Sequence, residues 1–184
     1  MMKKYEENPD DLSLIVAYAD YMKDYAEKYL GEKEMNPGSK LAIGSDHAGY
    51  VMKEDLKSML IEMGFEVTDM GTHDTASCDY PDFAAAVARA VAKGEAEAGI
   101  IVCSSGIGVS MTANKVRGVR AALVHHAYEA KMTRLHNDAN VLCLGANITG
   151  PAIAREAVHT FLSTDFEGGR HQRRVDKMMA IENE

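Results

Sequence analysis

The chain of 184 residues has few cysteines, no tryptophan and no long apolar run. Its three cysteines include no Cys-X-X-Cys pair, which argues against a disulfide framework or a zinc site and favours a reducing compartment. No apolar stretch approaches the ~20 residues that span a bilayer, and no apolar segment follows the first lysines as a signal peptide requires. We therefore expect a cytoplasmic protein with no membrane segment.

Positive charge is also scarce. Lys and Arg number 20 and Asp and Glu number 28, which gives a formal net charge of −8. Nucleic acids and anionic membrane surfaces attract basic proteins, so neither is an expected partner. The hydrophobic content of 46% and the charged content of 26% are ordinary for a soluble globular chain. The length suits one domain with an appendage.

The first 39 residues differ in character from the rest. Apolar side chains recur there every three or four residues between Leu12 and Tyr29, which predicts one amphipathic helix, and Asn36-Pro37-Gly38-Ser39 predicts a linker. An apolar stripe must lie against something, so this helix packs on its own domain or on a partner subunit, unless it serves regulation. We place the domain boundary between this extension, 1–39, and a globular domain, 40–184.

Short apolar segments and amphipathic segments alternate through the globular domain. Strands are predicted over 40–45, 65–70, 99–103, 120–124 and 140–144, and helices over 52–64, 80–92, 107–116, 127–135, 151–162 and 170–182. Such alternation is typical of a parallel sheet covered by helices on both faces. The predicted fold class is α/β, a three-layer Rossmann-like sandwich with a five-stranded parallel sheet, plus the N-terminal helix.

The stretch of greatest chemical interest runs from Gly99 to Lys115. An apolar strand ends at Cys103, a loop of serine and glycine follows, and a helix begins near Ile107. Ligands of α/β sheets bind outside the carboxyl ends of the strands, and the free N–H groups at a helix start suit an anion. The loop lacks the pattern of a nucleotide-binding loop. It is either a ligand-binding loop or a plain turn with a small buried cysteine.

Polar side chains also follow the first and fifth strands. Asp46 and His47 come after the first strand, and Asn147 comes just after the fifth. His47 is either a phosphate or sugar contact or a structural histidine. His136 and Asn137 precede the fifth strand, which places them at the opposite end of that strand from Asn147. A site shared between two subunits would remove this difficulty.

The last predicted helix carries positive charge in an acidic protein. Arg170 and Arg174 are four residues apart and lie on one face of it. Guanidinium groups on one face suit a phosphate, which each can bind through two hydrogen bonds. The alternative is a solvated helix whose charges are balanced by nearby acids.

Other residues of catalytic types show no pattern. His73, His125, His126 and His159 are interpreted as surface or packing residues, and Cys143, inside a strand, as a small buried hydrophobe. No set of His, Asp and Glu has the spacing of metal ligands, so we expect no metal site.

Several motifs, in one order along residues 40–182, resemble the type B ribose-5-phosphate isomerase family, which includes the galactose-6-phosphate isomerase subunits. The motifs are Gly44-Ser45-Asp46-His47-Ala48-Gly49, Asp79-Tyr80-Pro81, Cys103-Ser104-Ser105-Gly106-Ile107-Gly108-Val109-Ser110, Ala113-Asn114-Lys115, Gly118-Val119-Arg120, His136-Asn137-Asp138-Ala139-Asn140 and Phe166-Glu167-Gly168-Gly169-Arg170-His171. The resemblance implies an enzyme without metal or organic cofactor that interconverts an aldose phosphate and a ketose phosphate. It also implies a homodimer, or a tetramer, whose active sites are each built from two subunits.

The resemblance further implies a role for each candidate residue. Cys103 is the base that moves a proton between C1 and C2, Ser105 assists at the hydroxyl, and His136 opens the furanose ring. The N–H groups of the loop after the cysteine stabilise the enediolate oxygen. The substrate-binding residues are Asp46, His47, Tyr80, Ser104, Gly106, Ile107, Gly108, Asn137, Asn147, Arg170, His171 and Arg174.

Two positions separate this chain from other members of the family it resembles. Some members use a glutamate base where Val109 stands, so this chain is similar to the cysteine subgroup. Many members carry a phosphate-binding arginine where Asn147 stands, and the lost charge leaves the substrate length open. The expected reaction interconverts ribose 5-phosphate and ribulose 5-phosphate. The alternatives are a six-carbon sugar 6-phosphate of the allose or galactose type, or a non-catalytic sugar-phosphate-binding protein.

Overall fold

The computed structural model describes residues 38–184, so the predicted N-terminal helix lies outside the described residues. The strands are β1 (Lys40–Ser45), β2 (Glu66–Asp69), β3 (Ala98–Cys103), β4 (Ala121–Leu123) and β5 (Val141–Gly145). The helices are α3 (Tyr50–Glu62), α4 (Tyr80–Ala92), α5 (Ile107–Ala113), α6 (Ala127–Asn137), α7 (Pro151–Ser163) and α8 (Arg170–Ala180), followed by the 3₁₀ helix η1 (Ile181–Asn183).

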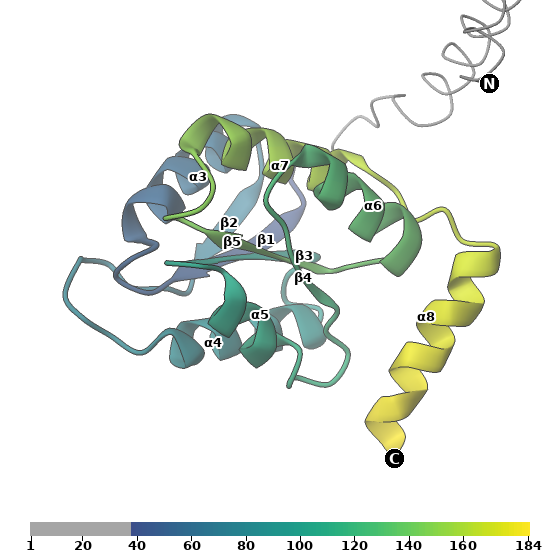
Figure 1. Ribbon diagram of the computed structural model, residues 1–184. Helices are drawn as coiled ribbons and strands as arrows, with labels where there is room; N and C mark the ends of the chain where they lie inside the picture. Colours follow the sequence, from purple (N-terminus) through teal and green to yellow (C-terminus); the bar gives the residue numbers. More distant parts are fainter. Residues whose placement is uncertain (1–37) are drawn as a thin grey trace, which may run out of the picture. The chain divides into compact units, whose positions relative to one another are not determined.

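The five strands form one parallel sheet in the order β2-β1-β3-β5-β4. Helices α3, α6 and α7 cover one face of the sheet, and α4 and α5 cover the other (Figure 1). The predicted three-layer α/β sandwich with a five-stranded parallel sheet is therefore confirmed. Among the described residues, no helix combines the length and apolar character that crossing a membrane requires.

The central strand β3 divides its side chains between two apolar layers, because successive residues of a strand point to opposite faces. Ile100 and Val102 pack in the layer under α3, α6 and α7, whereas Ile101 and Cys103 pack in the layer under α4 and α5. All four are buried. The sheet thus fixes the direction in which the Cys103 side chain leaves the strand.

Helix α6 is longer than the sequence predicted. It includes His136 and Asn137 in its last turn and ends at Asp138, whose φ of 48° is left-handed. Arg120 holds this end of the helix: its Nε donates to the Asp138 carbonyl at 2.7 Å, and its Nη2 lies 2.9 Å from the Asp138 carboxylate. The imidazole of His136 is therefore carried by a regular helix rather than by a loop.

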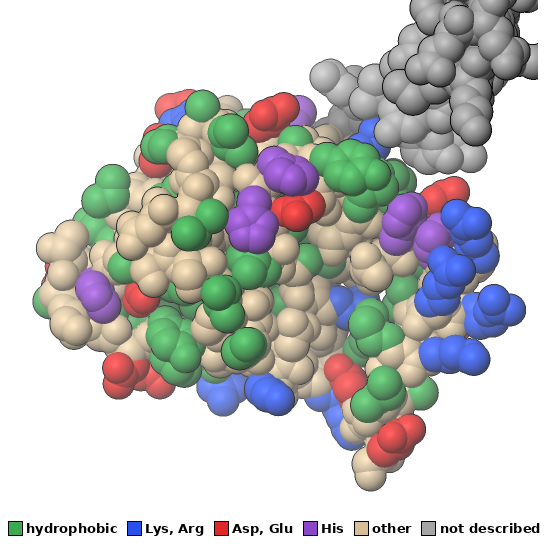
Figure 2. Space-filling model, viewed as in Figure 1, with side chains coloured by type: hydrophobic (Ala, Val, Ile, Leu, Met, Phe, Trp, Pro, Cys, Tyr) green, Lys and Arg blue, Asp and Glu red, His purple; other side chains and the backbone are tan. Residues whose placement is uncertain are grey.

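Helix α8 stands outside the three layers (Figure 1). It contacts the end of α6, and the Glu182 carboxylate just beyond it accepts a hydrogen bond from the Gly118 N–H at 3.0 Å. Lys and Arg side chains gather along this helix (Figure 2). A short helix with so little contact to its own core is suited to contact with another molecule.

Candidate active site

The side chain of Cys103 lies at the carboxyl end of β3 and is 4% exposed. Its sulfur accepts a hydrogen bond from the Gly106 N–H at 3.1 Å. Gly106 has a left-handed φ of 75°, and a Cβ there would come within 2.9 Å of the Leu144 carbonyl carbon. Only glycine suits this backbone conformation and this space, so the loop depends on it to point an N–H at the thiol.

The loop after Cys103 is tied to the loop after β5. The N–H of Ala146 donates to the Cys103 carbonyl at 2.8 Å, and the N–H of Asn147 donates to the Ser104 carbonyl at 3.0 Å. Ser105 Oγ accepts from the Ile107 N–H at 3.3 Å. Asn147 thus meets the cysteine loop through its backbone, while the residue itself is exposed.

Asp46 and His47 lie beside this loop because Ser45 pairs with Val102, the neighbour of Cys103. Asp46 is buried and accepts the Gly49 N–H at 2.9 Å. His47 Nδ1 accepts the Cys78 N–H at 3.2 Å, which leaves Nε2 free to donate.

Tyr80 reaches the cysteine loop from the start of α4, since a Cβ on Gly108 would come within 2.6 Å of its ring. The structure thus groups one set of predicted site residues, which we call the thiol cluster. It consists of Asp46, His47, Tyr80, Cys103 and the loop Ser104–Gly108.

A second set of predicted residues meets where α6 ends and α8 begins. The rings of His136 and His171 stack with their centroids 4.3 Å apart and their planes within 8°. Together with Asn137 and Arg174, they line a cavity of about 270 Å³. The Nε of Arg170 donates to His171 Nε2 at 3.3 Å, so this arginine binds a histidine rather than lining the cavity.

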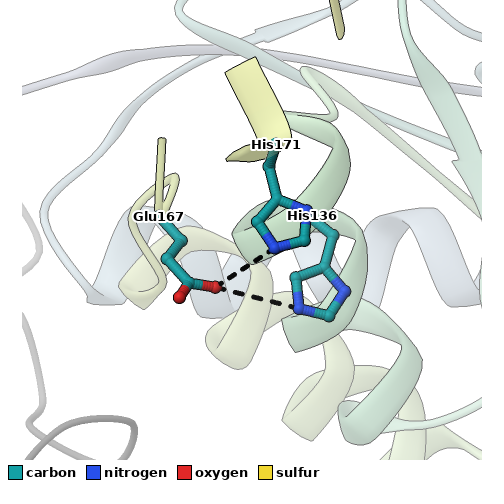
Figure 3. Close-up of side chains that lie close together, drawn as sticks. All are labelled: His136, Glu167 and His171. Carbon is teal, nitrogen blue, oxygen red and sulfur yellow. Dashed lines mark ion pairs between the residues drawn. The ribbon is translucent and has the colours of Figure 1, made fainter. Parts of the chain in front are cut away.

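Glu167 completes this second group; it lies in a motif noted in the sequence, which gave it no role. Its Oε2 lies 3.9 Å from His136 Nε2 and 3.5 Å from His171 Nε2 (Figure 3). We call His136, Asn137, Glu167, His171 and Arg174 the imidazole cluster. The spacing of Glu167 and His171, four residues apart, was a local signal, but His136 lies far from both along the chain.

The sequence showed no metal-ligand spacing, but the fold brings together three residues of metal-ligating types that are not neighbours along the chain. In the described part of the chain, the ligand atoms of His136, Glu167 and His171 lie within 4.8 Å of one another. However, the lone pairs of two stacked, nearly parallel rings do not converge on one point, and Arg170 already donates to His171 Nε2. The arrangement is better suited to proton exchange than to coordination.

The two clusters lie at opposite ends of β5 within one chain. Cys103 pairs with Gly145 at the end of the strand, whereas His136 precedes Val141 at its beginning. The two ends of β5, a strand of five residues, are separated by about 13 Å, at ~3.3 Å per residue. The predicted separation of His136 from Asn147 is thus confirmed, because Asn147 follows the far end of the strand.

Two histidines interpreted as surface residues have a structural role. The Nδ1 of His126 accepts the Glu129 N–H at 3.4 Å at the start of α6, and His125 Nδ1 lies 3.1 Å from the Glu129 carboxylate. Burial raises the pKa of the Cys143 thiol, which agrees with its interpretation as a small apolar residue.

Comparison with known proteins identifies the family. Residues 41–178 match the ribose/galactose isomerase family. The chain is 46% identical over 144 residues to a putative sugar phosphate isomerase, YwlF, of Bacillus subtilis, covering 78% of this chain and 97% of that one. It is 44% identical over 143 residues to ribose-5-phosphate isomerase B of Escherichia coli, covering 78% and 96%.

Solved structures agree with the sequence matches. Ribose-5-phosphate isomerase B of Clostridium thermocellum has a TM-score of 0.78 at 49% identity and covers 78% of this chain and 97% of that one. The Mycoplasma genitalium enzyme with bound ribulose-5-phosphate has a TM-score of 0.78 at 42% identity and covers 81% and 99%. These matches confirm the expected resemblance and the expected enzyme class, an aldose–ketose isomerase. The chain belongs to the ribose/galactose isomerase family.

Proposed function

We propose that the protein interconverts ribose 5-phosphate and ribulose 5-phosphate through an enediol(ate), with Cys103 as the base. The observation that carries this proposal is the Gly106 N–H aimed at the Cys103 sulfur at the end of β3. A donor in this position stabilises a thiolate, which is the form of cysteine that accepts a proton. The relatives named ribose-5-phosphate isomerase B support the choice of substrate.

The reaction needs a base and an oxyanion site at one place. Cys103 takes the proton from C2 of the open-chain aldose, which places negative charge on the C1 oxygen. The proton of the C2 hydroxyl then passes to the C1 oxygen, and the same thiol protonates C1 as the C2 carbonyl forms. The N–H groups of the loop Ser104–Gly108 stabilise the oxygen that becomes negative, and one such donor contributes roughly 3–4 kcal/mol. Ser105, next to the loop donors, assists at the hydroxyl. Asp46 and Tyr80 bind the sugar from the neighbouring elements.

The imidazole cluster supplies the groups for ring opening and for most of the phosphate binding, which the thiol cluster lacks. His136 opens the furanose ring, Asn137 binds sugar hydroxyls, and Arg174 holds the phosphate beside His171. In the thiol cluster, His47 offers a donor to the phosphate. The phosphate lies away from the reacting carbons, so its binding energy positions the substrate.

We propose that the two clusters meet across a homodimer. Within one chain they lie at opposite ends of β5, and α8 stands outside the layers (Figure 1). Apolar side chains near the thiol cluster are exposed: Ile107 at 50%, Met111 at 63% and Ile148 at 61%. A partner subunit that covers them would also bring its own imidazole cluster to Cys103. The described cysteines are free thiols, which suits the reducing cytoplasm that we propose for this enzyme.

A six-carbon sugar 6-phosphate is the second candidate substrate. The observation that favours it is the exposed, neutral Asn147 beside the Ser104 backbone, where many family members carry an arginine. A longer sugar would place its phosphate elsewhere. Comparing kcat/KM for ribose 5-phosphate with that for allose 6-phosphate and galactose 6-phosphate decides between the two chain lengths.

A coupled assay of ketose formation tests the proposed reaction. We expect turnover of ribose 5-phosphate, and we expect Cys103→Ala to lower kcat by about 10²–10⁴, the range of a general base. The matched control is Cys143→Ala, since the buried Cys143 thiol has a raised pKa and should not take a proton from substrate. Turnover of no sugar phosphate would refute the enzyme, and full activity of Cys103→Ala would refute only the base.

A further inference from the structure

The short segment between α7 and α8 places a carboxylate against two histidines. We propose that Glu167 is a positioning residue for ring opening, whose carboxylate attracts the His136 imidazole and holds it beside a neutral His171. This inference rests on the proposed function, because it assigns Glu167 to the step that His136 performs. Glu167 itself lies in the segment before α8 and acts through His136.

The backbone of Glu167 fixes it to the end of α6. Its N–H donates to the carbonyl of Leu135, the residue before His136, at 3.1 Å. Gly168 and Gly169 then turn the chain with positive φ values of 67° and 53°. Helix α8 begins directly afterwards, so His171 returns to the same side as the Glu167 carboxylate. A hydrogen bond and a glycine turn therefore hold the carboxylate beside both rings.

The contacts of His171 favour the neutral form of this ring. Stacked imidazoles 4.3 Å apart repel each other when both are charged. Arg170 donates to His171 Nε2, which requires that nitrogen to lack a proton, and Arg174 adds positive charge from α8. Burial, with help from the charges of His136 and the two arginines, lowers the pKa of His171.

His136 has a different environment from its stacking partner. It is partly exposed and lies in the last turn of α6, where the helix dipole favours a cation. The nearby Arg134 of the same helix is engaged by the Asp138 carboxylate at 3.2 Å. The Glu167 carboxylate faces both rings, and Arg170 donates to the His171 ring.

A charged His136 is the form that opens a furanose. The bond from C1 to the ring oxygen breaks with its electron pair passing to that oxygen, which takes the proton of the imidazolium. The anomeric hydroxyl then gives its proton to the neutral imidazole as the C1 carbonyl forms. The ring-closed sugar becomes the open aldose, and His136 regains its charge. Glu167 faces the His136 imidazole that performs both proton transfers.

The two chemical steps can be measured separately. Ribulose 5-phosphate has no furanose form, since its C5 oxygen carries the phosphate, so exchange of its C1 hydrogen in D₂O needs the Cys103 step alone. Conversion of ribose 5-phosphate needs ring opening as well. For Glu167→Gln we expect kcat/KM for ribose 5-phosphate to fall by about 10–100-fold, part of the usual contribution of a general acid. The exchange rate should change by less than about 3-fold.

The ratio of conversion to exchange gives a readout that mere packing would not move, because a general loss of packing lowers both rates. In Glu167→Gln this ratio should fall, since the carboxylate no longer faces His136. Glu167→Asp should restore part of the conversion, and the backbone bond to Leu135 is kept in both variants. The matched control is Glu156→Gln, which removes an exposed carboxylate from α7 and should change neither rate.

Each outcome decides the inference. Equal loss of exchange and conversion would show that Glu167 is structural and would overturn the proposal. Unchanged conversion in Glu167→Gln would overturn it as well, while leaving the proposed isomerase intact. A wild-type enzyme with neither exchange nor conversion would refute the proposed function and this inference with it. If Glu167→Gln melts well below the wild type, Glu167→Asp tests the proposal through the position of its shorter carboxylate: conversion should fall partly while exchange is kept, and equal loss of both rates would overturn the proposal.

Discussion

The thiol cluster and the imidazole cluster are built in different ways. The thiol cluster lies at strand ends, with a buried cysteine, a glycine loop and backbone hydrogen bonds from two loops. The imidazole cluster lies at helix ends, and all of its side chains except that of Asn137 are charged or titratable. The thiol cluster is held in place by packing and backbone hydrogen bonds, whereas the imidazole cluster is held by interactions between polar and charged side chains. Removing a proton from carbon requires a base in a fixed position, whereas binding a phosphate and opening a sugar ring require charged groups.

The separation of the clusters along β5 is the first point to test, and it has the largest expected effect. Cys103→Ala and His136→Asn should each be almost inactive alone. A hybrid dimer of the two would hold one site with both wild-type residues. Because one of its two sites is intact, the purified hybrid should reach roughly half of wild-type activity in a symmetric dimer with shared sites.

The hybrid is made by co-expressing the two variants with different tags and purifying the doubly tagged dimer. The control is a hybrid of Cys103→Ala with Cys103→Ser, which should stay inactive because no site regains the thiol. Persistent inactivity of the first hybrid would place both clusters of a working site in one chain and would contradict the shared site.

Because the thiol cluster depends on close packing, adding one methyl group at Gly106 should strongly lower the stability of the protein. Gly106→Ala combines a left-handed backbone with a clash against the Leu144 backbone, so it should lower the free energy of unfolding by about 2–5 kcal/mol. The matched control is Gly94→Ala, which has a similar φ of 73° and no atom within 4 Å of the added methyl group. That variant should lose only about 1–2 kcal/mol.

Urea unfolding measures both glycine variants, and the ribose 5-phosphate assay follows activity. Equal destabilisation of the two would mean that the backbone strain acts alone and that the space around Gly106 is unimportant. We also expect Gly106→Ala to lose activity beyond its loss of folded protein, because the N–H that faces Cys103 would move.

The same contrast explains what the sequence could predict. The strand before Cys103 and the loop after it are contiguous, so a local apolar pattern followed by glycine indicated the thiol cluster. The stacking of His136 on His171 joins α6 to α8, and no local period encodes a contact between distant helices. Glu167 was missed for the same reason, although its N–H binds the carbonyl next to His136. The fold was predictable because each strand and helix carries its own pattern.

The dependence of the imidazole cluster on charge predicts a binding effect. Arg174→Ala removes a guanidinium from the cavity, so KM for ribose 5-phosphate should rise by about 10–100-fold while kcat changes little. The matched control is Arg173→Ala, an exposed arginine on another face of α8 that does not line the cavity. Steady-state kinetics at constant ionic strength measure both variants. A similar rise in KM for Arg173→Ala would indicate general attraction by α8 rather than a phosphate contact.

The smallest expected effect is on the pH dependence of stability, and it tests the environment of His171. Its pKa is lowered in the folded protein, chiefly by burial, so the unfolded chain binds a proton more readily. The stabilising contribution is present above the unfolded pKa of about 6.5 and is lost as pH falls through the lowered folded value. His171→Gln should therefore show a smaller drop in Tm between about pH 7 and pH 5 than the wild type. The exposed His159 gives the control His159→Gln, which should keep the wild-type drop, and an identical drop in all three proteins would contradict the neutral His171.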